Sequence, residues 1–533
     1  MPRTPILLLL AAASLTAADY AAEGKLWWAH IQFLADDKLE GRNTGSEGYR
    51  QAATYVATQF EKLGLKPGGT SGYQQPVKFE TRTLVEAESS LALLAGDTVQ
   101  ELKLGQDATL AARGEAATIV TAPLVFVGYG LNIPEAGYND LKGLELQGKI
   151  AVYVNGPGPA KASGNVKSHY SSAAERWAAL HKAGAIGVVT IANPRMPAPG
   201  AAPGAGPGTP PAGGRGGRGA MPPQPVVSLA DASLRENTGM LVSAAITRNG
   251  GEKFFAGSGH TYEEILKLAA NNEALPTFPL AVSLRAKTAA TTGTLEAPNV
   301  AAILPGSDPK LKDEYVVFSS HLDHLGPGRP GAMDNASGVA SVLEVARLFK
   351  ESGVKPKRSI IFLTVTGEEK GELGSRYFAG HPTVPFKQIV ADINLDMFLP
   401  LYKLKVLEVQ GLTESTLGDL ITAAAKAEGV DVQTDREPEQ NRFIRSDQYS
   451  FIRQGIPSLA FKFGYEFGSP EEKTRTEWVK NIYHKAGDGL NQPVDTESAA
   501  KFDRIIFGLV QRIADDPNRP QWRADSFFKR FAK

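Results

Sequence analysis

The strongest constraint on the fold is the alternation of apolar strand segments with helix-patterned segments from about residue 297 onward. Near-continuous Val, Ile and Phe runs separated by helices predict a central, largely parallel sheet covered by helices on both faces. Active residues in such sheets gather beyond the carboxyl ends of the strands. The predicted strands are 299–304, 315–319, 359–366, 389–395 and 458–463, and the predicted helices are 336–351, 415–428 and 498–514.

Polar clusters follow these strands at the points where each strand ends. They are His321-Leu322-Asp323, Glu368-Glu369 and Asp396, together with Asp334-Asn335 in the loop that opens the first helix. Any one of them alone has an ordinary structural interpretation, such as a hydrogen-bonded core histidine, a solvated pair or a helix cap. The whole ordered set instead favours one site, because four strand exits or loops deliver carboxylates or imidazoles to the same edge.

Composition narrows the chemistry of that site and its partners. The chain contains no cysteine, so a metal would be held by His, Asp and Glu, which suits a hydrolytic site better than a structural zinc site. Its 57 basic and 57 acidic residues leave no net charge. A nucleic-acid partner is therefore not expected, since binding to a phosphate backbone requires a basic surface.

The amino terminus predicts export. Residues 1–18 have the pattern of a bacterial-type signal peptide, with Arg3 before an apolar run and small residues at a cleavage point. A periplasmic or secreted location is therefore expected. No second apolar stretch of about 18 residues follows, so no transmembrane anchor is expected.

At 533 residues, the chain exceeds the size of one hydrophobic core, and two domains are expected. A helix is predicted at 46–63, and short β-type runs follow from about residue 74. Residues 194–225 are rich in Pro, Gly and Ala, a composition that predicts a disordered surface loop. The role of that loop stays open.

The ordered motifs resemble the zinc-dependent aminopeptidase family that includes secreted bacterial leucyl aminopeptidases, aminopeptidase Y and the glutamate carboxypeptidases. The matching motifs are Glu40-Gly41-Arg42, His321-Leu322-Asp323, Asp334-Asn335, Glu368-Glu369, Asp396-Met397 and Tyr483-His484. The resemblance implies an α/β fold, a three-layer αβα sandwich around a mostly parallel mixed sheet. Segments such as Val127-Gly128-Tyr129-Gly130 resemble an inserted, β-rich protease-associated domain.

On this resemblance, residues 19–105 begin the peptidase domain, 106–275 form the protease-associated insert and 276–533 form the catalytic domain. The family pattern implies two Zn²⁺ ions per chain and an attacking hydroxide held by them. Asp334 would bridge the ions. The other implied ligands are His321 and Asp396 on one zinc, and Glu369 and His484 on the other.

The resemblance also implies roles for three further residues. Glu368 would be the general base and then the acid for the leaving amine. The Asp323 carboxylate would accept the second imidazole N–H of His321 and fix its tautomer. Tyr483 would be an oxyanion donor, although a packing tyrosine is an equal interpretation of its position.

Two positions depart from the family pattern. Gln448 stands where related sequences often have His, and Lys485 stands where they often have Thr, whereas Asp488 follows at the expected place. Neither departure falls on an implied metal ligand. These two departures therefore leave the chemistry of the substrate pocket open.

Several functions remain open at this stage. The first is an aminopeptidase that acts on peptides with a free N-terminus. The second is a carboxypeptidase, which needs a basic pocket that Arg436, Arg442, Arg445 and Arg453 could supply. A glutaminyl cyclase-like enzyme and a receptor-like ectodomain are disfavoured because all five ligands and the base are present. The sequence leaves open the preferred N-terminal residue, the metal used in the cell and the oligomeric state.

Overall fold

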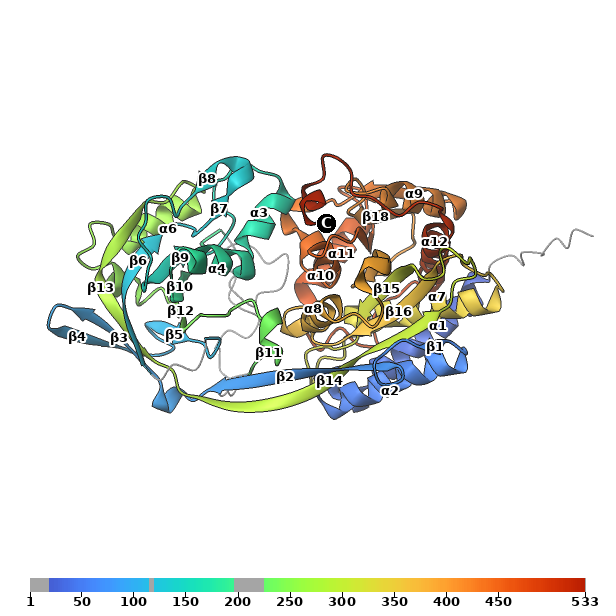
Figure 1. Ribbon diagram of the computed structural model, residues 1–533, viewed down its shortest axis with the longest axis horizontal. Coiled ribbons are helices and arrows are strands. Elements are labelled where there is room, and N and C mark those ends of the chain that lie inside the picture. The colour runs from blue at the N-terminus through green and yellow to red at the C-terminus, as the bar shows by residue number, and fades with distance from the viewer. Residues whose placement is uncertain (1–18, 115–118, 196–224, 533) are drawn as a thin grey trace, which may run out of the picture.

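The computed structural model describes residues 19–114, 119–195 and 225–532, which form two lobes side by side (Figure 1). One lobe contains a ten-stranded sheet and the other an eight-stranded sheet. The predicted signal peptide 1–18 and nearly all of the predicted loop 194–225 lie outside the described residues. Within the described ranges, no helix has both the length and the apolar character needed to cross a membrane.

The larger sheet is mixed, with a parallel centre. Its order is β11 (Val226–Leu229), β2 (Gln74–Leu84), β14 (Ala290–Leu304), β16 (Ser359–Val365), β15 (Tyr315–His321), β17 (Ile389–Leu395), β20 (Ser458–Phe463), β18 (Val406–Gln410) and β19 (Asp431–Thr434), with β1 (Lys66–Pro67) beside β14. The four strands β16, β15, β17 and β20 run parallel. Antiparallel pairing begins on either side, at β14 with β16 and at β18 with β20. The expected mixed sheet is thus confirmed, and its parallel part is the centre.

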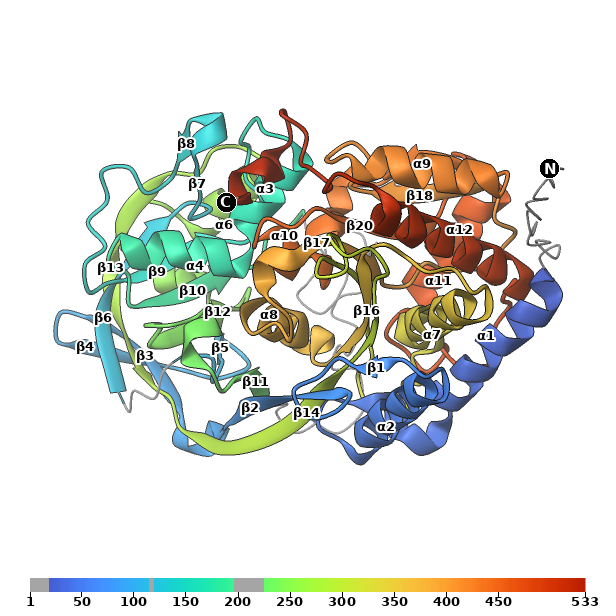
Figure 2. The ribbon, with the colours of Figure 1, turned by 45° about the vertical axis from the view of Figure 1, so that its right-hand side comes forward.

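Helices cover both faces of this sheet. One face carries α1 (Tyr20–Leu34), α2 (Glu47–Lys62), α7 (Ser337–Glu351), α9 (Leu417–Ala427) and α12 (Thr496–Asp515), and the other carries α8 (Leu373–Gly380) and α10 (Gln448–Ile452). Figure 2 shows α7 and α12 on one side of β16 and α8 and α10 on the other. In β15, Val316 and Phe318 belong to the hydrophobic cluster on one face of the sheet, and Val317 belongs to the cluster on the other face. This alternation follows from the two-residue period of a strand. The three-layer arrangement is therefore confirmed.

The second lobe is β-rich and carries four further helices. Its sheet runs β4 (Thr98–Leu102), β3 (Ser90–Ala95), β13 (Thr277–Lys287), β6 (Ile119–Val127), β9 (Ile150–Val154), β10 (Gly187–Ile191), β12 (Val242–Ile246) and β5 (Ala108–Leu110). The helices are α3 (Gly164–Ser171), α4 (Ala173–Lys182), α5 (Gly251–Phe255) and α6 (Tyr262–Ala270). Strands β3, β4 and β13 fall outside the expected insert 106–275, so this sheet extends further at both ends. Its relation to a protease-associated domain stays a prediction.

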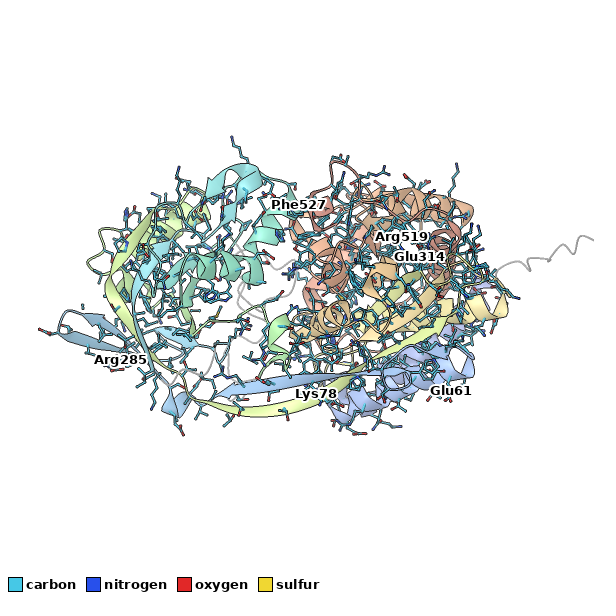
Figure 3. The ribbon with its side chains drawn as sticks, in the orientation of Figure 1. Glu61, Lys78, Arg285, Glu314, Arg519 and Phe527 are labelled. Carbon is cyan, nitrogen blue, oxygen red and sulfur yellow. The ribbon has the colours of Figure 1, made fainter. Side chains whose placement is uncertain are left out.

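Among the described residues, the contacts between the lobes include two groups. At the first, β2 leads into the second lobe and β14 returns from it, and Val85 N donates to Ala289 O at 2.9 Å. Lys78 on β2 and Arg285 on β13 mark the two sides of this crossing in Figure 3. At the second, Arg453 pairs with Glu175 at 3.2 Å. Phe527, labelled between the lobes in Figure 3, lies 5.3 Å from the His169 ring of α3.

The aromatic packing between α12 and the loop after β17 generates a stability prediction. Phe502 is fully buried and stacks on Phe398 with ring centroids 4.4 Å apart. Phe502→Ala is expected to lower the free energy of unfolding by about 3–5 kcal/mol. The loss has two parts, because the variant buries less apolar surface and also leaves a cavity. Urea unfolding of the purified protein measures it. Phe467, 65% exposed, supplies the control, whose replacement by Ala should cost about 1 kcal/mol or less. Equal losses for the two variants would contradict the packing described.

Candidate metal centre

The five predicted ligands come together at one edge of the large sheet. His321 is the last residue of β15, Asp396 directly follows β17, and Glu369 lies in the turn after β16. Asp334 lies in the irregular turn Ala332–Ala336 that opens α7, and His484 lies beyond α11 (Pro470–Asn481). Because β15, β16 and β17 are parallel, their carboxyl ends meet there.

Asp334 lies at the centre of the cluster. Its Oδ1 is 3.4 Å from His321 Nε2, and that same nitrogen is 3.6 Å from Asp396 Oδ1. Its Oδ2 is 3.1 Å from His484 Nε2, which in turn is 3.4 Å from Glu369 Oε2. The two oxygens of Asp334 therefore face imidazoles on opposite sides, the placement that a carboxylate bridging two metal ions requires.

A sixth residue, His324, belongs to the cluster and was not singled out from the sequence. Its side chain is fully buried, with Nδ1 2.7 Å from Glu369 Oε1 and 3.8 Å from Asp334 Oδ2. Two residues separate His324 from His321, and in a loop such a spacing does not show whether the second imidazole also points into the site. The visible signal was composition, since the chain has only eight histidines and two of them stand in this one segment.

The buried polar atoms of the cluster suit a bound cation. Seven lack a hydrogen-bond partner within the described structure: His321 Nε2, both ring nitrogens of His324, Asp334 Oδ2, Glu369 Oε1, Asp396 Oδ1 and His484 Nε2. Buried polar atoms are rarely left in this state. Two groups, His321 with Asp334 and Asp396, and His324 with Asp334 and Glu369, each bring ligand atoms within 4.8 Å of one another. Imidazole nitrogen and carboxylate oxygen are ligands that zinc accepts, so these residues fit the metal that the sequence implied.

The charges of the cluster shift several pKa values. Burial raises the pKa of Glu368 well above its usual value, and Asp396 and Glu369 add to the effect. Burial also acts to raise the pKa of Asp334, but the surrounding imidazoles outweigh it and hold that pKa well below its usual value. The pKa of His484 rises to about 10, because Asp334 and Glu369 outweigh the opposing effect of burial. A concentration of negative charge thus surrounds the imidazoles.

Two buried charged residues hold the metal-ligand loops in place. The Asp488 carboxylate accepts the backbone N–H groups of Met333 at 2.8 Å and of Asp334 at 3.0 Å. Arg42 is fully buried, and its guanidinium donates to the carbonyls of Leu322 at 3.0 Å and Gly331 at 2.9 Å. Both residues belong to motifs that the sequence singled out, and their observed partners are backbone atoms of the loops that carry the ligands.

The contact of Asp323 differs from the expected one. His321 Nδ1 lies 3.1 Å from the backbone carbonyl of Asp323, not from its carboxylate. The carboxylate instead accepts the Thr44 hydroxyl at 2.8 Å and the backbone N–H of Glu368 at 3.1 Å. The short turn after β15 points the carbonyl at the ring and leaves the side chain free to reach the neighbouring strand exit. Asp323 therefore acts on Glu368, and the His321 tautomer is held by a main-chain atom.

Tyr483 and Gln448 line a pocket beside the cluster. The Tyr483 ring stacks on the His484 ring with centroids 3.7 Å apart. Gln448 donates to the carbonyl of Phe443 at 3.0 Å and accepts from Asn394 at 2.7 Å, so it fixes part of the wall. Lys485 is half-buried and donates to the carbonyl of Lys480 at 2.8 Å.

Comparisons with known proteins place this geometry in a class. Residues 299–510 match the family model described as Peptidase family M28. Leupeptin-inactivating enzyme 1 of Streptomyces exfoliatus is 27% identical over 230 residues, 42% of this chain and 50% of that protein. The probable leucine aminopeptidase 2 of Aspergillus oryzae is 31% identical over 204 residues, 36% of this chain and 40% of that protein. The chain thus matches about half or less of these relatives' length.

A solved structure extends the likeness in fold to nearly the whole chain. The aminopeptidase from Aneurinibacillus sp. strain AM-1 superposes with a TM-score of 0.54 at 23% identity and covers 93% of this chain and 95% of that one. The part of the chain that carries the candidate metal centre therefore shares the fold of that aminopeptidase. Its residues 299–510 are similar to peptidase family M28.

Proposed function

We propose that this protein is an exported, two-zinc aminopeptidase that removes the N-terminal residue of peptides. The observation that carries the proposal is the position of Asp334, whose two oxygens face separate imidazoles. The family of residues 299–510 and the aminopeptidases similar to this chain support the reaction. Export rests on residues 1–18 and stays a prediction from the sequence.

In this proposal one zinc is held by His321, Asp334 and Asp396. The second is held by Asp334, Glu369 and His484, and His324 is added as its fourth protein ligand because its Nδ1 lies 2.7 Å from Glu369 Oε1 without the alignment of a hydrogen bond. When bound, the two ions would polarise the scissile carbonyl and lower the pKa of the attacking water.

The chain's own residues supply the proton transfers. Glu368 lines the pocket beside Asp334 and Asp396, which places its carboxylate where it would take a proton from water and pass it to the leaving amine. Asp323 holds the backbone of Glu368 at 3.1 Å and so fixes the base against the cluster. Tyr483 lines the same pocket and is proposed to donate its hydroxyl proton to the oxygen on which negative charge develops.

A carboxypeptidase is the second candidate. The four arginines that the sequence suggested for its basic pocket lie in different places. Arg442 and Arg445 line the pocket beside the cluster. Arg453 instead pairs with Glu175 of the other lobe at 3.2 Å, and Arg436 pairs with Glu466 at 3.2 Å. A basic pocket is therefore present, but it is formed by only two of the four. The receptor-like and glutaminyl cyclase-like alternatives have no specific observation in their favour.

Hydrolysis of a substrate panel tests the proposed reaction. The mature, zinc-loaded protein is expected to release p-nitroaniline from aminoacyl-p-nitroanilides and to leave N-acetylated dipeptides intact, because a free amine is needed next to the metals. A chelator should abolish the release, and zinc should restore it. Metal analysis of the same sample should give two equivalents of zinc. Hydrolysis confined to the acetylated dipeptides would replace the aminopeptidase with a carboxypeptidase.

Replacement of the proposed base separates chemistry from metal binding. Glu368→Gln is expected to retain both zinc ions and lose about 10²–10⁴-fold in kcat, the range associated with a general base. Stopped-assay rates and metal analysis on the same preparation provide the two measurements. Glu88→Gln, at an exposed position on the other lobe, is the matched control and should keep the wild-type rate. Near-normal turnover of Glu368→Gln would remove this residue from the mechanism.

Loss of His324 should weaken one metal more than the other. His324→Ala is expected to lower the affinity for the second zinc by at least ~10-fold, since it deletes one of four protein ligands. The stoichiometry after dialysis against a graded series of chelator concentrations should fall toward one zinc per chain before the wild type does. His260→Ala, an exposed histidine on the other lobe, is the control. Identical metal retention by His324→Ala and wild type would exclude this residue as a ligand.

A further inference from the structure

The pocket beside the candidate metal centre is lined by chemically different groups of side chains. Three carboxylates of the candidate centre, Asp334, Glu368 and Asp396, line it. Four cations, Arg442, Arg445, Lys462 and Arg475, also line it and together are called its cationic wall. The lining further includes the apolar side chains of Met397, Leu399 and Val479. A ligand that filled this pocket beside the metals would therefore meet positive charges.

Lys462 is the cation closest to the metal ligands. It comes from the central strand β20, is only 6% exposed, and donates to the backbone carbonyl of Asp396 at 2.6 Å. Within the described structure, no carboxylate forms an ion pair with it. A buried ammonium group without an ionic partner is costly, so its remaining donors are available to an anion that enters the pocket.

The arginines of this wall also keep free donor capacity. Arg442 pairs with Glu437 at 2.8 Å through Nη2, and its Nη1 lies 3.8 Å from Asp435 Oδ1 but has no hydrogen-bond partner within the described residues. Arg445 donates to the carbonyl of Gln440 at 3.2 Å, and among the described residues it has no carboxylate partner. The buried Nε2 of Gln410, which lines the same pocket, is likewise unpartnered.

The acids that balance these cations lie behind the wall. Arg475 is 3% exposed and binds both oxygens of the fully buried Glu408, at 3.0 and 3.2 Å. Glu437 contacts both Arg442 and Arg475, at 2.8 and 3.4 Å. Neither Glu408 nor Glu437 lines the pocket. The ion pairs therefore hold the guanidinium groups in place while the lining itself stays cationic on this side.

We propose that this wall binds a carboxylate of the substrate. The inference rests on the proposed function for the position of the scissile bond and adds the class of substrate. An N-terminal Glu or Asp would place its side-chain carboxylate at Lys462 and Arg445 and its short hydrocarbon stem along Met397 and Leu399. A C-terminal carboxylate has the same chemistry, and the experiment separates the two sources.

The test compares isosteric substrates of the zinc-loaded, full-length protein. The kcat/KM for α-glutamyl-p-nitroanilide is expected to exceed that for glutaminyl-p-nitroanilide at least ~10-fold, because a charge-assisted hydrogen bond is lost with the amide. Leucyl-p-nitroanilide should also be cleaved more slowly than the glutamyl compound. A glutaminyl or leucyl substrate cleaved as fast as the glutamyl one would overturn the side-chain source.

Variants of the wall assign the effect to named residues. Lys462→Met and Arg445→Gln should each lower the glutamyl-to-glutaminyl ratio of kcat/KM at least ~5-fold, a readout that a general loss of activity does not move. Arg445 is exposed, so its replacement keeps the test valid if Lys462→Met fails to fold. Arg248→Gln, at a residue with a side chain 81% exposed, should leave the ratio unchanged. An unchanged ratio in both wall variants would refute the assignment.

Two further measurements distinguish this inference from the proposed function. The zinc-loaded protein could cleave only N-acetylated dipeptides, and among these only the ones with a free C-terminal carboxylate and not the C-terminal amides. That result would refute the proposed aminopeptidase activity. It would still support the carboxylate site, with the C-terminal carboxylate of the substrate as its ligand. Binding of glutarate and glutaramide is then compared by thermal shift in wild type and Arg445→Gln. Tighter binding of glutarate that is lost in the variant supports the site without any turnover, and equal binding of the two compounds overturns it.

Discussion

The crowding of buried carboxylates around Asp334 is the constraint on which the rest of the structure depends. Glu368 and Glu369 follow β16, Asp396 follows β17 and Asp334 lies in the turn that opens α7. Burial alone would raise the pKa of each. Like charges about 4 Å apart repel by ~4 kcal/mol at the effective dielectric of a protein surface. Such an arrangement persists only where positive charge compensates it, which is the charge that two bound metal ions would supply.

The loops that carry these groups are tied together by residues distant in the chain. Arg42 belongs to the amino-terminal segment, which precedes the family match at 299–510, yet its guanidinium binds carbonyls in the loops after β15 and before α7. Asp488 performs the complementary task from the other end of the chain by accepting the N–H of Asp334. The metal-ligand geometry is therefore a property of the whole lobe. Residues outside the matched segment are structural members of the site.

The sequence predicted the elements with strong periodicity and the residues at their ends. Helix α2 begins and ends within one residue of the expected 46–63, because Ser46 caps it and an apolar stripe runs its length. Three of the five expected ligands, His321, Glu369 and Asp396, converge because parallel strands bring their carboxyl ends together. His324 and the carbonyl of Asp323 were missed because loop conformation, not periodicity, decides where they point. The limits of the second lobe were missed because β3 and β13 have the same strand pattern as their neighbours in the large sheet.

The crossing at Val85 and Ala289 has a consequence for how the chain folds. Strands β2 and β14 are adjacent in the large sheet, so the second lobe is an insertion into what is otherwise a β-hairpin. Ser89 and Ala289 are separated by 200 positions, and closing a flexible loop of that length costs ~5 kcal/mol of chain entropy. Once the second lobe is folded, its own pairing of β3 with β13 holds those two ends side by side. The folded lobe then acts as a turn between β2 and β14. The antiparallel pairing of these two strands therefore no longer costs the full entropy of closing a flexible loop.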